Sequence, residues 1–201
     1  MGDYDLIQGD QLKALLNEVV TPYLSPLGLK WRGDNYWISE MNNSIRKVVA
    51  YNYSKGGGGC LSYGVCLDFI PLPSDSKLRY FRTEKSVREH IWIVGKDRIS
   101  QWTKDNVKKS ITKAITKDIQ NIESWFNKIH SLEELRQIVY IQIKREDIYV
   151  RYPSPLYVQA FIEAKLGNID KGLELLEKYL SWSHENENIK KLLRSKLVTT
   201  K

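Results

Sequence analysis

The cations and aromatic rings between Lys77 and Lys117 are the residues of this sequence with the clearest potential for chemistry. This stretch holds twelve Lys or Arg against four Asp or Glu, whereas the rest of the chain holds 19 basic and 20 acidic residues. The formal net charge of +7 is therefore concentrated in one part of the chain. Such a concentration favours contact with an anionic partner.

Two groups of residues in this stretch are candidates for that contact. In the first group, basic side chains are interleaved with aromatic ones, and its members are Arg79, Arg82, Lys85, Arg88 and Trp92. The second group is Lys109, Lys113 and Lys117, whose spacing of four places them on one side of a helix. Three interpretations remain open: a solvated surface without a partner, a surface for an acidic protein, and a surface for single-stranded nucleic acid, whose phosphates bind cations and whose bases stack on rings.

Residue types for catalysis or metal binding are few. The histidines His90, His130 and His184 have no metal-binding spacing, and with Cys60 and Cys66 they form no recognisable zinc motif. The two cysteines lie too far apart along one predicted strand for a disulfide, which indicates two reduced thiols in a cytosolic protein. His90 is a candidate base, but the sequence names no partner for it. We expect no metal and no cofactor, and the balance is against an enzyme.

The glycine run Gly56–Gly59 raises the question of a phosphate-binding loop. A Walker-type loop needs its lysine after the glycines and a helix next, but here Lys55 precedes them and a predicted strand follows. We therefore interpret the glycines as a loose hairpin tip, with a mobile ligand-gating loop as the alternative.

The sheet-forming residues that would position these groups lie in the first half of the chain. Strict alternation predicts a strand over Leu61–Phe69, and β-branched and aromatic residues predict one over Arg46–Ser54. Two short aromatic arms around residues 33–35 form a further hairpin, and His90–Gly95 is a short strand at the sheet edge. Ile70–Lys77, with two prolines, is expected to be a loop.

Apolar residues at steps of three and four predict the helices. One helix is expected from an Asp10 N-cap to an end bracketed by Pro22 and Pro26, and another begins at a Thr103 cap. Ser131–Glu134 reads as a capping box, with its helix ending near Arg145. Ala160–Leu180 resembles one tetratricopeptide-type helical hairpin, for which we expect a capping role, with a peptide-binding groove as the alternative. A short basic helix follows at 189–197.

These elements predict an α+β fold. An antiparallel sheet of about five strands is packed by helices and followed by a helical C-terminal segment with the single tetratricopeptide-like hairpin. We expect residues 1–150 to form the α+β domain and residues 151–201 a helical C-terminal cap. The sequence has no apolar run near the ~20 residues that a membrane helix needs, and its polar N-terminus is no secretory signal. We therefore expect a cytoplasmic protein without a membrane partner.

The segments "YLSPLGLKWRGDNYWIS" and "VVAYNYSKGGGGCLSYGVCLDF" carry a family resemblance. Over roughly residues 10–145 they resemble a bacterial family known as domain of unknown function 4304, which opens with a helix and a "pLGFk" hairpin. Leu27–Lys30 matches that hairpin and Tyr63–Val65 the later "NlGv" strand, whereas Tyr53 replaces the expected glutamine. The family supplies no catalytic residues. The resemblance implies a binding role associated with immunity or defence.

The leading functional hypothesis is therefore a non-enzymatic binding protein of bacterial conflict or defence. It would be immunity-like or antitoxin-like and use its basic face on an acidic protein partner. A nucleic-acid-binding accessory protein is the alternative, and an enzyme of unrecognised type is the second alternative.

Overall fold

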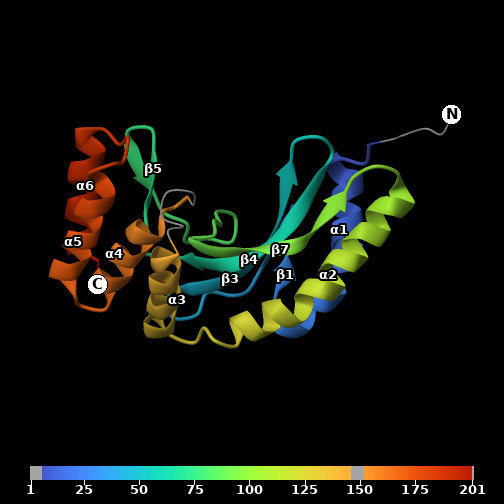
Figure 1. Ribbon diagram of the computed structural model, residues 1–201, viewed down its shortest axis with the longest axis horizontal. Coiled ribbons are helices and arrows are strands. Elements are labelled where there is room, and N and C mark those ends of the chain that lie inside the picture. Colours follow the sequence, from blue (N-terminus) through green and yellow to red (C-terminus); the bar gives the residue numbers. More distant parts are fainter. Residues whose placement is uncertain (1–5, 146–151, 201) are drawn as a thin grey trace. The chain divides into compact units, whose positions relative to one another are not determined.

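The computed structural model describes residues 6–145 and 152–200 and confirms the α+β class (Figure 1). Its contacts divide the chain into two compact units, each made of two separate segments. Unit 1 comprises Met1–Cys66 and Trp92–Asn127, and unit 2 comprises Leu67–Ile91 and Lys128–Lys201. The predicted domain boundary near residue 150 stays a prediction. The basic stretch is shared between the two units.

Unit 1 is built around the five-stranded antiparallel sheet that the alternation predicts, in the order β1-β2-β3-β4-β7. The strands are β1 (Lys30–Trp31), β2 (Tyr36–Ile38), β3 (Ile45–Ser54), β4 (Gly58–Leu67) and β7 (Ile91–Ser100). Trp37 opposite Val49 fixes the register between β2 and β3. The edge strand β7 is longer than the predicted His90–Gly95, because pairing with the ten-residue β4 continues through residues with little strand propensity of their own.

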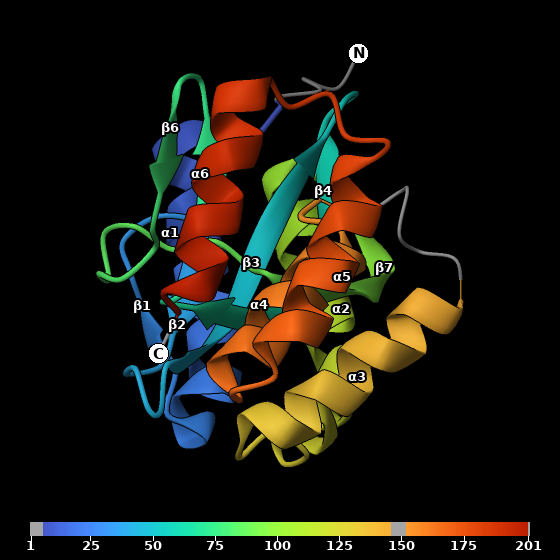
Figure 2. The ribbon, with the colours of Figure 1, turned by 90° about the vertical axis from the view of Figure 1, so that its left-hand side faces the viewer.

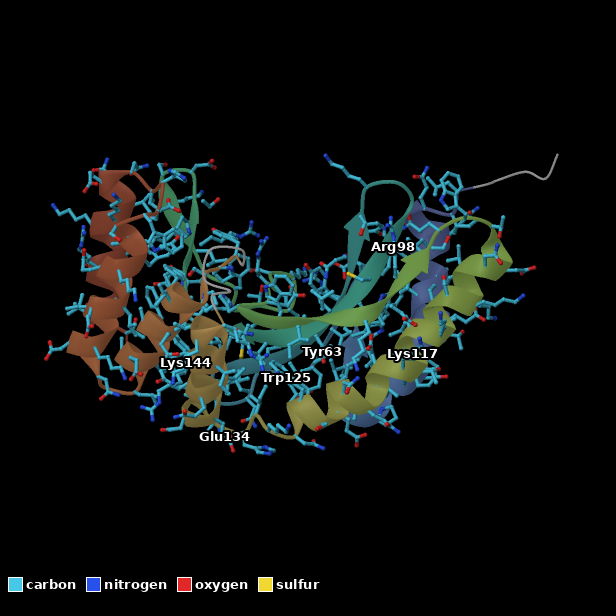
Figure 3. All side chains as sticks on the ribbon, in the orientation of Figure 1. Tyr63, Arg98, Lys117, Trp125, Glu134 and Lys144 are labelled. Carbon is cyan, nitrogen blue, oxygen red and sulfur yellow. The ribbon has the colours of Figure 1, made fainter. Side chains whose placement is uncertain are left out.

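Helices α1 (Gly9–Leu24) and α2 (Lys104–Phe126) pack against each other and lie on the same side of the sheet (Figure 1). Their apolar stripes are buried, as the periodicity predicts. The indole of Trp37 donates a 2.9 Å hydrogen bond to Thr21 on α1. Tyr63 of β4 meets Trp125 of α2 edge-on, with ring centroids 5.8 Å apart (Figure 3). The odd-numbered side chains of β4 thus face the helices.

The predicted helix starts are partly wrong. Gln8, not Asp10, is the N-cap of α1, and Asp10 lies inside the first turn, where it pairs with Lys13 at 2.9 Å. The predicted end of α1 is confirmed, because the helix ends at Leu24, between Pro22 and Pro26, and continues into the 3₁₀ turn Ser25–Leu27. Thr103 does occupy the N-cap position of α2, but its side chain makes no capping hydrogen bond because its backbone has a φ of +59°.

Unit 2 contains the helices α3 (Leu132–Lys144), α4 (Pro155–Lys165), α5 (Ile169–Leu180) and α6 (Glu187–Val198) (Figure 2). The capping box of α3 forms as predicted, and Glu134 lies at its start (Figure 3). The hairpin of α4 and α5 is also confirmed, with Gly167 at a φ of +88° in its turn. Every residue of α4 from Pro155 to Ala164 is buried, because α3, α5 and α6 all contact it. The hairpin is therefore one part of a four-helix group.

The expected loop Ile70–Lys77 instead contains a small β-hairpin in unit 2. Strands β5 (Leu72–Ser74) and β6 (Lys77–Arg79) pair antiparallel around a two-residue turn. Asp75 takes a φ of +55° in that turn, which Asp tolerates better than most residues. Pro73 is tolerated in β5 because both strands of a two-stranded sheet are edge strands, where the backbone N–H that proline lacks need not pair. The hairpin brings Arg79 onto a fixed strand.

The glycine run forms a hairpin turn between β3 and β4, but the prediction that all four residues form a loose tip is wrong for half of them. Gly56 and Gly57 make the turn with positive φ angles. Gly58 and Gly59 belong to β4, and a Cβ at Gly59 would lie 2.4 Å from the carbonyl oxygen of Asn52 and 2.5 Å from the Tyr51 ring. Glycine is required at positions 58 and 59 because the neighbouring strands lie too close to β4 there for a side chain.

Candidate binding surfaces

The predicted lysine row lies on the exposed side of α2 in unit 1. Lys109, Lys113 and Lys117 are all exposed, whereas Ile111 and Ile115 on the other side of the helix are completely buried. Figure 3 shows Lys117 on the outer part of α2. The amphipathic pattern therefore placed these three side chains correctly on one helix face.

Two of these lysines have an acidic partner that the sequence pattern did not reveal. Asp97 of β7 has a side chain that is 19% exposed, and its carboxylate lies 3.0 Å from Lys117 Nζ and 3.9 Å from Lys113 Nζ. Nearer the start of α2, Lys108 pairs with Glu18 of α1 at 2.6 Å. Part of the positive charge of α2 is therefore compensated within unit 1.

Asp118 fixes β7 against α2 and so places Asp97. Asp118 is buried, and one carboxylate oxygen accepts the backbone N–H of Lys96 at 3.4 Å. The other oxygen approaches Gly95 so closely that a Cβ there would lie 2.3 Å from it. Burial raises the pKa of the Asp118 carboxyl, and the hydrogen bond from Lys96 only partly opposes this. Gly95 is thus required by the close approach of a buried carboxyl.

The opposite side of β7 carries cations that the predicted site did not include. The side chain of Asp97 and the side of the strand on which a Cβ at Gly95 would lie both face α2. Because side chains alternate along a strand, Lys96 and Arg98 face away from α2. Both are exposed, and Arg98 donates to the carbonyl of Lys55 in the β3–β4 turn at 3.3 Å (Figure 3). Trp92 shares their parity and is half-buried. Alternation along residues 91–100 could have predicted this row once the strand was known to reach Ser100.

In unit 2, each of the three predicted arginines lies over an aromatic ring. The guanidinium of Arg82 is 4.2 Å from the Tyr80 ring centroid, that of Arg79 is 5.4 Å from Phe81, and that of Arg88 is 5.5 Å from Tyr152.

One of these arginines, Arg82, makes a further contact. Arg82 also donates to the carbonyl of Asp68 at 3.1 Å. All three arginines and Lys85 are exposed. The interleaving of basic and aromatic residues in the sequence therefore does correspond to contacts in the structure. These contacts join an arginine to a ring of the same chain.

His90 is a buried structural residue and not a surface base. It is 3% exposed, and its Nδ1 accepts the backbone N–H of Leu67 at 3.0 Å. Its ring meets Phe81 edge-on, with centroids 5.9 Å apart. Burial lowers the pKa of His90 to about 3, and the nearby charge of Arg88 acts in the same direction. A neutral imidazole therefore supports the segment that carries Arg79, Arg82 and Arg88.

The predicted site residues divide between the two units. Arg79, Arg82, Lys85 and Arg88 belong to unit 2, and Trp92 with the three lysines of α2 belongs to unit 1. Neither Cys60 nor Cys66 is in a disulfide. Residues 6–145 and 152–200 hold no cluster of three metal-ligating side chains.

Comparisons with known proteins found no match. The chain matches no protein-family model, and searches of curated proteins and of solved structures likewise found no match. Within the described part of the chain, no helix has the length and apolar character needed to cross a membrane.

Proposed function

We propose that this protein is a non-enzymatic binding protein whose exposed arginines in unit 2 contact acidic side chains of a protein partner. The observation that carries the proposal is that Arg79, Arg82 and Arg88 each lie over an aromatic ring while remaining exposed. The ring holds the planar guanidinium of the arginine in place. An arginine held in this way loses less side-chain entropy than a mobile one when its guanidinium binds a carboxylate with two hydrogen bonds.

The state of two of the three rings favours a protein over single-stranded nucleic acid. Base stacking needs an open aromatic face. Phe81 is 8% exposed, Tyr80 is half-buried, and both have an arginine over the ring. These two rings serve as supports for cations, which leaves them poorly suited to stack on bases.

The biological setting of this binding is proposed from the resemblance to domain of unknown function 4304. That resemblance suggests an immunity-like or antitoxin-like role in bacterial conflict. On this basis, the protein partner that the arginines contact would be an acidic toxin or nuclease.

The test uses two variants that separate recognition from charge. Arg79→Ala, Arg82→Ala and Arg88→Ala together remove both the charge and the planar group, whereas the matched triple Arg→Lys variant keeps the charge alone. Affinity capture from nuclease-treated extract of cells that express the protein identifies a partner, and calorimetry with the purified partner measures affinity. We expect both variants to lose at least about tenfold in affinity, since lysine does not replace a two-point contact.

A labelled single-stranded oligonucleotide gives the competing result. Binding that rests on phosphate neutralisation follows the number of charges, so the Arg→Lys variant would bind the oligonucleotide as the wild type does. If the captured partner is nucleic acid, or if the Arg→Lys variant binds the protein partner with unchanged affinity, the proposal is wrong.

A further inference from the structure

The side of β7 that faces away from α2 carries a row of three exposed side chains. Val94, Lys96 and Arg98 share one parity on the strand, and the side chain of Val94 is 46% exposed. Because every second side chain of a strand points to the same face, neighbours in this row are about 7 Å apart. The row therefore presents one apolar side chain and then two cations to solvent.

Arg98 is held on this face by the turn between β3 and β4. Its Nη2 donates to the carbonyl of Lys55 at 3.3 Å, and its Nε lies 3.0 Å from the position that a Cβ at Gly58 would take. Gly58 thus leaves room for the guanidinium, which gives the glycine run a role beyond the turn itself. A guanidinium positioned in this way loses less side-chain entropy when it pairs with a carboxylate.

The charge of this row is not compensated by an ion pair. Within the described part of the chain, neither Lys96 nor Arg98 pairs with an acidic side chain. On the other side of β7, in contrast, Asp97 pairs with Lys117 at 3.0 Å and with Lys113 at 3.9 Å. The open side of β7 therefore has the charge complementary to an anionic partner.

The spacing of the row favours an extended acidic peptide segment as that partner. Every second side chain of an extended chain points the same way and recurs at the spacing of the row. Acidic side chains at alternate positions would therefore meet Lys96 and Arg98 together. Single-stranded nucleic acid would need open rings on which its bases stack, but Trp92, the one aromatic residue of β7, is half-buried.

We propose that this face of β7 is a docking site for an extended acidic segment of a protein. The segment would carry two acidic residues at alternate positions and an apolar residue two positions from one of them. Its carboxylates would pair with Lys96 and Arg98, and its apolar side chain would cover Val94. The site lies in unit 1 and does not depend on the arginines of unit 2 in the proposed function.

The probe is the capped peptide acetyl-Ile-Ala-Glu-Ala-Glu-Ala-Ile-amide, titrated into the full-length protein by NMR at low salt. Its apolar residue at each end serves either direction along β7. A matched peptide, acetyl-Ile-Ala-Glu-Glu-Ala-Ala-Ile-amide, has the same composition and charge but adjacent acidic residues, and a third peptide has Gln in place of both Glu residues of the probe.

We expect the probe to bind saturably and to shift the amide resonances of β7. It should bind about threefold or more tightly than either matched peptide. Each of these peptides loses at least one ion pair, and an exposed ion pair contributes modestly to affinity.

Substitutions in the row test the assigned contacts. Arg98→Gln should weaken the probe by about fivefold, because a charge-assisted contact with two hydrogen bonds is lost. Lys96→Gln should weaken it by about threefold and provides the test of charge if Arg98→Gln unfolds. Lys109→Gln removes an exposed charge from α2 as a control and should have no effect.

Several results would overturn the proposal. These are equal binding of the probe and either matched peptide, an equal loss in Lys109→Gln, tighter binding of a short thymidine oligonucleotide than of the probe, or no saturable binding. The triple Arg→Ala variant at Arg79, Arg82 and Arg88 should bind the probe normally, so failure of the arginine surface and failure of this site are distinguishable.

Discussion

His90 shows how its surroundings decide the chemistry of one residue. The sequence places it among cations, where it is a candidate base, but in unit 2 it accepts a backbone N–H and lies against Phe81. A buried imidazole that already accepts a hydrogen bond is poorly placed to exchange protons with a substrate. Its contribution is to the stability of the segment that carries the arginines.

The stability of the protein should therefore depend on pH through His90. The pKa of His90 is about 3 in the folded protein and about 6.5 when unfolded. The unfolded state binds a proton first, so this contribution is present above pH 6.5 and is lost as the pH falls toward 3. At pH 4.5 the loss should be about 2–3 kcal/mol.

The measurement is the free energy of unfolding in urea at pH 7.0, 5.5 and 4.5. His90→Gln offers an amide in place of the imidazole but has no titrating group. The difference between wild type and variant should shrink as the pH falls. Parallel curves would mean that His90 is not buried as described.

At the scale of elements, strands β4 and β7 each contain a glycine at a position where close packing excludes a side chain. The Asp118 carboxyl lies close to Gly95, and the backbone of Asn52 and the ring of Tyr51 lie close to Gly59. Gly56, in contrast, has open space around it and needs glycine only for its φ of +88°. The same residue type is present for two different reasons within four positions.

A matched pair of substitutions separates these two reasons. Gly59→Ala should destabilise the protein by about 1–3 kcal/mol, because backbone and ring atoms must move to admit the new methyl group. Gly56→Asn should be close to neutral, since Asn tolerates the left-handed conformation. Thermal unfolding of both variants is the measurement. Equal melting temperatures would show that the β3–β4 connection is loose throughout.

Helix α2 and strand β7 are joined by charge as well as by apolar packing. The exposed Lys117 and Lys113 share the half-buried Asp97. Lys113→Glu with Lys117→Glu would bring two carboxylates near a third, and we expect a loss of up to about 1 kcal/mol, discounted because both lysines are exposed. Lys109 forms no ion pair with the residues that the structure describes, so Lys109→Glu serves as the control.

Melting temperatures at low and high salt test this expectation. The loss in the double variant should shrink at 1 M salt, where the Debye length is about 3 Å. A double variant as stable as Lys109→Glu at low salt would show that Asp97 contributes nothing to the attachment of α2.

At the scale of the whole molecule, the net charge of +7 is distributed over surfaces in both units. The lysines of α2 are exposed, whereas the arginines of unit 2 lie over rings. Exposed charges at the rim of an interface act mainly on the rate of encounter, and charges that become desolvated act mainly on the rate of dissociation.

The two groups should therefore affect binding kinetics differently. With the protein partner identified by capture, Lys109→Gln, Lys113→Gln and Lys117→Gln together should slow association several-fold, and this effect should shrink at high salt. The triple Arg→Ala variant should mainly speed dissociation. Surface plasmon resonance at two salt concentrations measures both rates. Identical association rates for wild type and the lysine variant would indicate that the α2 face is only a solvated surface.

The sequence by itself determined the local structure of this protein. Alternation over Leu61–Phe69, the apolar stripe of α2 and the capping box at Ser131 depend on neighbours along the chain, so they were predicted nearly to their ends. The five-stranded antiparallel sheet followed from short connections between such strands. The side of α2 that carries the lysines was predicted for the same reason.

The tertiary structure alone decided which distant residues meet. The pairing of Asp97 with Lys117, the burial of His90 beside Leu67, and the contact of Arg98 with the β3–β4 turn join separate segments of the chain. Spacing in the sequence carries no signal for such contacts, because they depend on how elements pack and not on the residues next to them. Both the internal pairing of the basic face and the cation row on the open side of β7 arise at that level.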